Sequence, residues 1–277
     1  MAHNPSVAEI WQAVAEWAPS TLAEEWDNVG LQVGDPAAKV KKIVTALDVS
    51  QPLVAFAIDT RADIVFTHHP LIFAPLKQLD LSSPIPRVIS TLIRHDIALL
   101  SAHTNLDSVS NGVSDQLAAM LELMDVLPLC PEPSGQYPSA GLGRVGRLPE
   151  PLSLRQVSQH VCVRLGLPGV YVTGDPNMVV NRVAVCGGSG SSLWPAFVES
   201  GAELFVTAEV KHSVAREAEM RGLAVMDAGH FATERPIIPI LTEYLRSIAI
   251  DRQWDVKVLM FRDEKMPASW FVPGAEE

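Results

Sequence analysis

The chain has 277 residues, of which 48% are hydrophobic and 19% charged, so it can bury a sizeable core and does not resemble a disordered sequence. This length allows one large domain or two modest ones. The formal net charge of −11 argues against nucleic acid or an anionic membrane as the main partner, because both bind through basic surface, whereas it suits cation binding.

The three cysteines, Cys130, Cys162 and Cys186, are far apart and form no C-x-x-C pair. The sequence therefore lacks a thiolate zinc signature, and an odd number of cysteines argues against a disulfide framework. The N-terminus has no basic segment followed by an apolar one, and no apolar run approaches the length of a membrane span. We expect a soluble, cytoplasmic protein without a signal peptide.

The first segment predicts a capped helix followed by a turn-rich loop. Ser6 and Glu9 have the spacing of a capping box, and apolar residues repeat at helical spacing up to Trp17. Residues 24–35 then hold four acids, two glycines and a tryptophan around a short strand. They are either an ordinary surface loop or a loop held in place for a purpose, and this composition favours the second.

Three apolar strands separated by helices come next. The strands are expected at 42–47, 64–67 and 97–102. One helix is expected to begin at Ser50 or Pro52, and another at Pro86. This β-α-β-α-β order is the signature of a mostly parallel sheet covered by helices. A further helix is expected over 112–123.

A proline- and glycine-rich stretch at 130–143 predicts a linker or long surface loop and a domain boundary. We expect a first α/β domain made of residues 1–128 and 232–277, and a second of residues 129–231. Further strands are expected at 144–148, 170–173, 182–186, 203–207, 223–226 and 255–261. Further helices are expected at 153–165, from just after 192 to 200, at 212–221 and at 233–248.

Six side chains with metal-binding chemistry follow predicted strands. In open α/β sheets the carboxyl ends of the strands are where ligands and catalytic groups collect. Imidazole and carboxylate without thiolate suit Zn, Fe, Mn, Co or Ni, and so many groups exceed one tetrahedral site, so two bridged ions fit better. Each histidine taken alone is more often structural than a ligand; the shared location favours metal. The six are His68, His69, His103, Asp107, His230 and Glu234.

The adjacent pair His68 and His69 adds a geometric condition. Successive residues on a strand point to opposite sides, so both rings serve one site only if the chain turns at His69, where Pro70 restricts it. The other interpretation is one packed and one solvated histidine.

The glycine-rich run from Gly187 to Ser192 follows a predicted strand and precedes a helix, as a phosphate cradle does. It matches neither G-x-x-x-x-G-K-[ST] nor a complete G-x-G-x-x-G, and no Lys or Arg lies between Val183 and Leu204. A tight connection from strand to helix is therefore favoured over a nucleotide site.

Three motifs resemble the signatures of the Nif-three-like family, whose members are dinuclear-metal hexamers often labelled GTP cyclohydrolase I type 2 homologues. The motifs are Thr67-His68-His69-Pro70, His103-Thr104-Asn105-Leu106-Asp107 and Gly229-His230-Phe231-Ala232-Thr233-Glu234-Arg235, and Trp26-Asp27-Asn28-Val29-Gly30-Leu31 resembles a fourth. They occur in the family's order. One departure is Thr207-Ala208-Glu209, where the family often has Thr-Gly-Glu or Thr-Gly-Asp.

The resemblance implies metal ligation by His68, His69, Asp107, His230 and Glu234, with Asp107 or Glu234 bridging two divalent transition-metal ions. It places His103 at the edge of the site. It also implies a homohexamer, a trimer of dimers, and a nucleotide such as GTP as substrate.

The resulting hypothesis is a two-domain α/β protein with mostly parallel or mixed sheets covered by helices and a metal site in the interdomain cleft. The function expected is metal-dependent hydrolysis, with His103 and Glu209 as catalytic proton carriers. The alternative is a non-catalytic metal-binding scaffold or regulatory protein. The tryptophans are either core or, as aromatic residues often are, part of subunit interfaces. They are Trp11, Trp17, Trp26, Trp194, Trp254 and Trp270.

Overall fold

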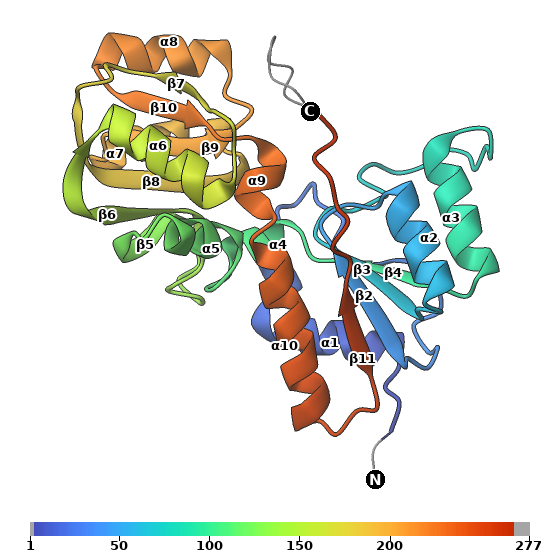
Figure 1. The fold of residues 1–277 in the computed structure, drawn as a ribbon. Coiled ribbons are helices and arrows are strands. Elements are labelled where there is room, and N and C mark those ends of the chain that lie inside the picture. The colour runs from blue at the N-terminus through green and yellow to red at the C-terminus, as the bar shows by residue number, and fades with distance from the viewer. Residues whose placement is uncertain (1–2, 269–277) are drawn as a thin grey trace. The chain divides into compact units, whose positions relative to one another are not determined.

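Two α/β units make up residues 3–268, the part of the chain that the computed structural model describes (Figure 1). The first unit comprises residues 3–112, 132–140 and 236–264, and the second comprises residues 113–131, 141–235 and 265–268. The α/β class and the mixed, helix-covered sheets expected from the sequence are confirmed. In the part of the chain described, no helix is both long and apolar enough to cross a membrane.

The sheet of the first unit has five strands in the order β1-β4-β3-β2-β11. β4, β3, β2 and β11 run parallel to one another, whereas β1 is antiparallel to β4. The central strands are buried along their whole length, as expected for parallel strands covered on both faces. The strands are β1 (Gly30–Val33), β2 (Lys42–Ala46), β3 (Ile64–Thr67), β4 (Ala98–Ser101) and β11 (Lys257–Met260).

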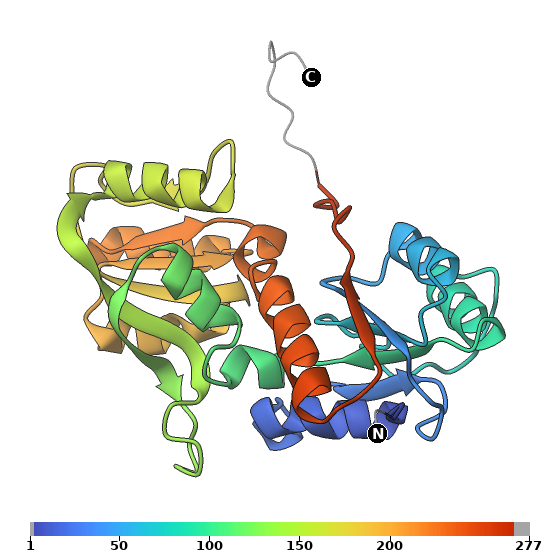
Figure 2. The ribbon, with the colours of Figure 1, turned by 60° about the horizontal axis from the view of Figure 1, so that its bottom comes forward.

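Side chains that alternate along these strands bury the two faces against different helices. Val44, Val65 and Leu99 share one apolar cluster with residues of α2 and α3. On the opposite face, Phe66 stacks with Trp11 of α1, and α10 packs beside α1 (Figure 2). The helices are α1 (Val7–Trp17), α2 (Gln51–Asp59), α3 (Pro84–Arg94), α4 (Thr104–Ser108) and α10 (Ile237–Asp251), with a 3-10 turn, η1 (Ser20–Leu22).

The second unit has a six-stranded sheet in the order β5-β6-β8-β9-β10-β7. β8, β9 and β10 are parallel, and the outer pairings are antiparallel. The strands are β5 (Met124–Pro131), β6 (Gly141–Ser153), β7 (Tyr171–Thr173), β8 (Val179–Ser189), β9 (Leu204–Ala208) and β10 (Ala224–Asp227).

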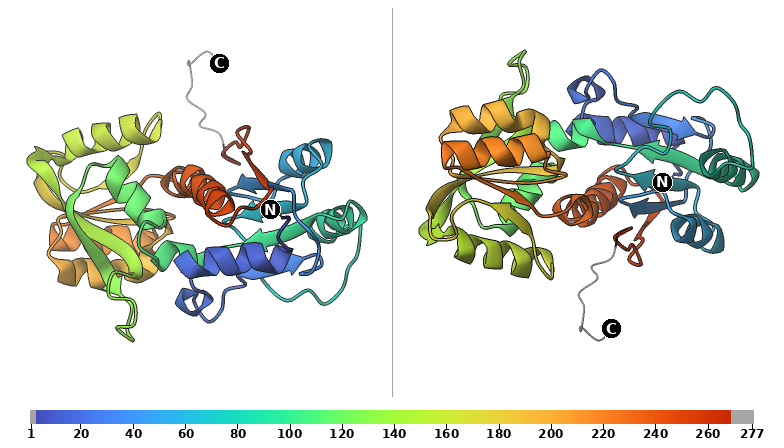
Figure 3. Two further views of the ribbon diagram at one scale, coloured as in Figure 1. Left: turned by 90° about the horizontal axis from the view of Figure 1, so that it is seen from below. Right: turned by 90° about the horizontal axis from the view of Figure 1, so that it is seen from above.

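Helices cover both faces of this sheet too (Figure 3). Val185 and Val206 face a cluster with α5 and α6, while their neighbours Ala184 and Phe205 face a second cluster with α7 and α8. This period of two is the expected signature of strands buried on both sides. The helices are α5 (Val113–Met120), α6 (Leu154–Leu165), α7 (Trp194–Ser200), α8 (His212–Arg221) and α9 (His230–Glu234), with a 3-10 turn, η2 (Ser191–Leu193).

Three predicted elements differ from the structure. The stretch expected as a linker at 130–143 begins inside β5 and ends inside β6, which pair antiparallel. The helix expected over 233–248 is interrupted at Pro236, which lacks the amide that a helix interior needs, so α9 and α10 are separate. The strand expected to end at Cys186 continues through the glycines as far as Ser189.

Most tryptophans of the described chain belong to the interior of a unit. Trp194 and Trp254 are buried, and Trp17 is half-buried against Tyr244, with ring centroids 4.7 Å apart. Only Trp26 among those described is strongly exposed, at 57%. Trp270 lies outside the described residues. The tryptophans therefore add little support for a subunit interface.

Candidate metal centre

Three histidines meet at one edge of the first unit's sheet. His68 and His69 follow β3, and His103 follows the parallel neighbour β4, so all three leave the sheet at the carboxyl ends of strands. One ring nitrogen from each lies within 4.8 Å of the others. The chain also turns so that the rings of His68 and His69 lie on the same side, with centroids 4.9 Å apart. The hydroxyl of Thr67 donates to the His69 carbonyl at 2.8 Å and supports this turn.

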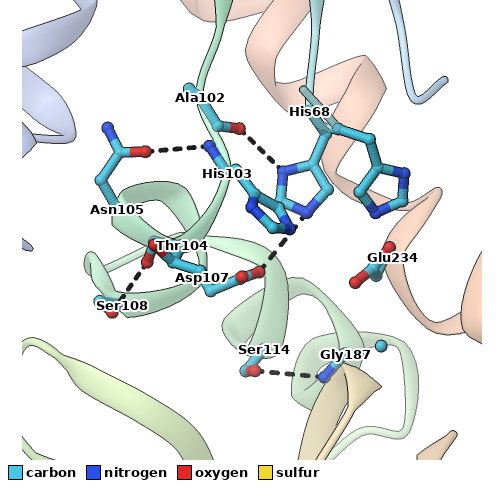
Figure 4. Close-up of polar contacts among 12 residues, drawn as sticks. His68, Ala102, His103, Thr104, Asn105, Asp107, Ser108, Ser114, Gly187 and Glu234 are labelled. Atoms are coloured by element: carbon cyan, nitrogen blue, oxygen red, sulfur yellow. Dashed lines mark hydrogen bonds and ion pairs between the residues drawn. The ribbon is translucent and has the colours of Figure 1, made fainter. Parts of the chain in front are cut away.

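His68 is fully buried and its ring orientation is fixed (Figure 4). Nδ1 lies 2.9 Å from the carbonyl oxygen of Ala102. Because a carbonyl only accepts, Nδ1 carries the hydrogen, and in the neutral ring the lone pair is on Nε2. Nε2 lies 3.6 Å from Oδ1 of Asp107. This arrangement presents an imidazole nitrogen and a carboxylate oxygen to the same space.

Asp107 reaches this position because of a single helical turn. α4 begins directly after His103, and the amide of Asp107 donates to the His103 carbonyl at 3.0 Å. The side chain of Asn105 caps the turn by accepting from the His103 amide at 3.0 Å (Figure 4). Its own amide group donates to the Ala18 carbonyl at 2.8 Å. The H-T-N-L-D motif is thus a structural unit that carries both an imidazole and a carboxylate.

Carboxylates orient the other two histidines of this sheet edge, His69 and His103. Nδ1 of His69 lies 2.8 Å from Oδ1 of Asp48, which follows β2, and Nδ1 of His103 lies 2.9 Å from Oδ1 of Asp27. A carboxylate on Nδ1 fixes the tautomer and makes Nε2 a better metal ligand. The carboxylates of Asp48 and Asp27 were not among the site residues predicted from the sequence.

Asp27 remains ionised despite its burial. Its side chain is fully buried, and burial alone raises the pKa of its carboxyl. The hydrogen bonds from the His103 ring and from the hydroxyl and amide of Thr104 outweigh burial and hold the pKa well below its usual range. At neutral pH the carboxylate that contacts His103 Nδ1 is therefore negatively charged.

The second unit contributes an imidazole and a carboxylate from α9. His230 and Glu234 are four residues apart, so they share a helix face, and Nε2 of His230 lies 3.1 Å from Oε2 of Glu234. Glu234 is almost completely buried, at 3% exposure. Nδ1 of His230 lies 3.0 Å from Oε1 of Glu209, which repeats the carboxylate–imidazole arrangement of the first unit.

Glu209 has a backbone conformation that non-glycine residues seldom adopt. Its φ is +52°, in the left-handed region, directly after β9. In Thr207-Ala208-Glu209, the left-handed residue is the glutamate and not Ala208, which is fully buried. The alanine that departs from the family pattern therefore does not occupy the strained position. The carboxylate of Glu209 orients His230, and its expected catalytic role stays a prediction.

The glycines after Cys186 serve packing within the second unit. The amide of Gly188 donates to the Thr233 hydroxyl at 3.0 Å, and the amide of Gly190 donates to the Thr207 hydroxyl at 2.9 Å. The amide of Gly187 donates to the Ser114 hydroxyl at 3.4 Å (Figure 4). Amides engaged in this way do not form a phosphate cradle, which agrees with the interpretation of Gly187–Ser192 as a connection.

The donor set fits transition-metal ions in both units. The first unit provides three imidazoles and Asp107, and the second provides His230 and Glu234, all nitrogen and oxygen donors that suit Zn, Fe, Mn, Co or Ni. Sequence reasoning missed Asp48, although it ends a strand at the same sheet edge as His69. Asp27 lies within the motif at residues 26–31, but nothing in that motif shows that its carboxylate contacts His103.

The fold and these groups define an α/β protein with two mixed sheets and histidine–carboxylate groups able to bind metal ions. The chain belongs to the Duf34/NIF3 (NGG1p interacting factor 3) family, whose model matches residues 5–267.

Individual relatives agree with this assignment over nearly the whole chain. A Streptomyces coelicolor protein named "GTP cyclohydrolase 1 type 2 homolog" is 40% identical over 257 residues, which is 92% of this chain and 90% of that protein. The crystal structure of a Bacillus cereus protein related to NIF3 has a TM-score of 0.92, with 24% identity, and covers 98% of this chain and 100% of its own; it supports the fold alone. The Staphylococcus aureus hypothetical protein SA1388 has a TM-score of 0.90, with 26% identity, and covers 96% and 99%.

Proposed function

We propose that this protein is a metal-dependent hydrolase with a dinuclear centre. The proposed ligands are the five nitrogen and oxygen donors His68, His69, Asp107, His230 and Glu234. The observation that carries the proposal is that a hydrogen bond orients each histidine ring. The Nδ1 atoms of His68, His69 and His230 each lie 2.8–3.0 Å from an oxygen atom. Such partners are typical of metal-binding histidines and less needed for histidines that merely pack.

The number of donors favours two ions over one. A catalytic tetrahedral site needs three protein ligands and an open position for water. Five ligands, two of them carboxylates able to bridge, are more than one such site uses. We propose Asp107 or Glu234 as the bridging carboxylate.

Bound ions would lower the pKa of a coordinated water and stabilise the oxyanion that develops during hydrolysis. The residues of this chain would supply the rest. His103, whose Nδ1 is held by Asp27, would carry a proton at its Nε2 atom. Glu209 would keep the ring of His230 in its metal-binding orientation and is the second candidate proton carrier.

The substrate class comes from the relatives and not from the geometry. The Streptomyces coelicolor protein and others similar to this chain are named GTP cyclohydrolase 1 type 2 homologues. We therefore propose a nucleotide such as GTP, hydrolysed at its purine ring, as the first substrate to test. The proposed setting is a homohexamer acting on a small molecule.

The test is turnover by metal-loaded protein on a panel of nucleotides and phosphoesters, with His68→Ala and Glu234→Ala as variants. If the protein is a hydrolase, both variants should lose turnover and stay folded at 25 °C. If wild-type protein turns over nothing and both variants mainly lower the melting temperature, the ions are structural, since metal that binds only the folded state stabilises it. That result would support the scaffold alternative and exclude the hydrolase.

A further inference from the structure

Two large aromatic side chains lie exposed together on the first unit. Trp26 is 57% exposed and Phe73 is 56% exposed, and their ring centroids are 5.5 Å apart with an angle of 45° between the ring planes. Tryptophan is highly buried on average, so an exposed pair of this size is unusual. Trp26 comes from the loop before β1, and Phe73 from the loop after β3.

Both rings also lie close to the ring of His103. The ring of His103 lies edge-on to Trp26 at a centroid distance of 6.1 Å and edge-on to Phe73 at 6.3 Å. His103 is one of the three histidines whose ring nitrogens gather within 4.8 Å. The exposed aromatic pair therefore borders the candidate metal-binding histidines within a single unit.

A hydrogen-bonded frame holds the two loops together. The side-chain amide of Asn28 donates to the Ile72 carbonyl at 2.6 Å. Gln32 accepts from the Ile72 amide at 2.9 Å and donates to the Asn28 carbonyl at 2.8 Å. These bonds tie Asn28, two residues after Trp26, to Ile72, which directly precedes Phe73. Ordering a surface loop costs conformational entropy, so two loops tied together while their aromatic rings stay exposed point to a ligand.

We propose that Trp26 and Phe73 form a stacking platform for a planar heteroaromatic ring of the substrate, which places the bond to be hydrolysed beside His103. The aromatic faces recognise a flat π system, and their tilt forms a corner that accepts one ring. The net charge of −11 opposes attraction of an anionic ligand, so affinity has to come from the ring more than from a phosphate. The catalytic part of this proposal rests on the proposed hydrolase, whereas ring stacking does not require metal.

The experiment measures ligand binding by calorimetry and by tryptophan fluorescence, with and without chelator. The probes are GMP, UMP and nicotinamide mononucleotide, and ribose 5-phosphate is the probe that lacks a ring. The variants are Trp26→Ala, Trp26→Phe and Phe73→Ala. Tyr171→Ala is the matched control, because Tyr171 is an exposed aromatic residue, at 74%, on β7 of the second unit.

We expect at least one ring-bearing probe to bind and to quench fluorescence, while ribose 5-phosphate does neither. Trp26→Ala should raise Kd on the order of 10- to 100-fold, in line with the loss of one stacked aromatic contact. Trp26→Phe should keep most of the affinity, and Tyr171→Ala should keep all of it. Metal content should be the same in all four variants.

Three results would overturn the platform. The first is that no ring-bearing probe binds the wild type more tightly than ribose 5-phosphate does. The second is binding that Trp26→Ala leaves unchanged. The third is a change in oligomeric mass in Trp26→Ala with ligand binding intact, which would identify the pair as a subunit surface. Trp26-dependent ring binding in a protein without turnover would instead keep the platform and refute the hydrolase.

Discussion

A Cβ atom added at Gly188 would lie 2.1 Å from Oε1 of Glu234 and 3.0 Å from Nε2 of His230. The first distance is far shorter than any non-bonded contact, so the absence of a side chain at this position is what allows Glu234 to lie where it does. Gly188 also has a φ of +63°, which L-residues seldom adopt. A position in the glycine-rich run thus acts on the candidate metal centre through steric exclusion and not through phosphate binding.

Gly188→Ala should therefore displace Glu234 and lower metal content as well as stability. Left-handed strain costs about 1–2 kcal/mol in free energy of unfolding, and displacing the end of the Glu234 side chain adds to this cost. Gly201→Ala is the matched control, because Gly201 has a φ of +71° and an added Cβ would meet nothing within 4 Å. The control should cost about 1 kcal/mol and keep its metal. Equal losses of stability and equal metal content in the two variants, by urea unfolding and elemental analysis, would refute the steric role of Gly188.

Metal stoichiometry is the most direct prediction. Protein purified without chelator, or reconstituted, should hold about two transition-metal ions per chain, as a two-metal centre requires. Asp107→Ala should lose more metal than His103→Ala, because Asp107 is proposed as a ligand and His103 as its neighbour. Elemental analysis after desalting decides the matter. Trace metal after reconstitution, or equal loss in the two variants, contradicts the ligand assignment.

The carboxylate behind His69 should matter for metal and little for folding. Asp48→Ala removes the partner of His69 Nδ1 and should weaken metal binding by roughly 10- to 100-fold. The Asp48 side chain is 46% exposed, so the free energy of unfolding of the metal-free protein should change by only about 0.5 kcal/mol. Asp59→Ala, at the exposed end of α2, is the control and should alter neither quantity. Competition titration against a metal indicator measures the affinity; an unchanged value for Asp48→Ala would show that this contact does not tune the site.

The local elements were predictable because their signals are local. Ser6 with Glu9 forms the capping box of α1, and Ser153 with Gln156 forms that of α6. β5 escaped prediction because Pro128 and Pro131 argue against a strand, yet β5 lies at the edge of its sheet, where proline is tolerated.

The candidate site shows the same limit. The strand-end rule brings His68, His69 and His103 to one edge because their strands are parallel neighbours. The pairing of His103 with Asp27 joins residues 76 positions apart, and no local pattern encodes it. The collision that excludes a side chain at Gly188 is likewise visible only once α9 is packed against β8.

Stability in acid should depend on Asp27. Its pKa is lowered in the folded protein, so its contribution to stability is present above the unfolded pKa of about 3.9 and is lost as the pH falls further through the folded value. In chelator-treated protein, the wild type should therefore be more stable than Asp27→Asn at pH 6, and the difference should shrink below about pH 4. Asp251→Asn, at the exposed end of α10, should show no such pH-dependent difference. Urea unfolding between pH 3 and 7 tests this, and a difference that grows toward low pH would reverse the assigned sign.

Assembly is the last prediction. By resemblance to its family the chain should form a hexamer, and the described surface offers apolar side chains that a monomer would leave in water. Val163, Val179 and Met220 are 79%, 65% and 79% exposed, and Leu79 is 61% exposed. Large apolar groups at a surface are a common feature of protein–protein contacts, and closed point-group symmetry is the usual outcome for identical chains. The charge of −11 per chain opposes assembly, but salt at physiological strength screens it beyond about 8 Å. Light scattering coupled to size exclusion, at 0.05 and 0.5 M salt, should give about six times the 30.0 kDa of one chain, with the hexamer favoured at the higher salt. A mass near 30.0 kDa at micromolar concentration in both salts contradicts the hexamer, and then the exposed apolar residues need another partner.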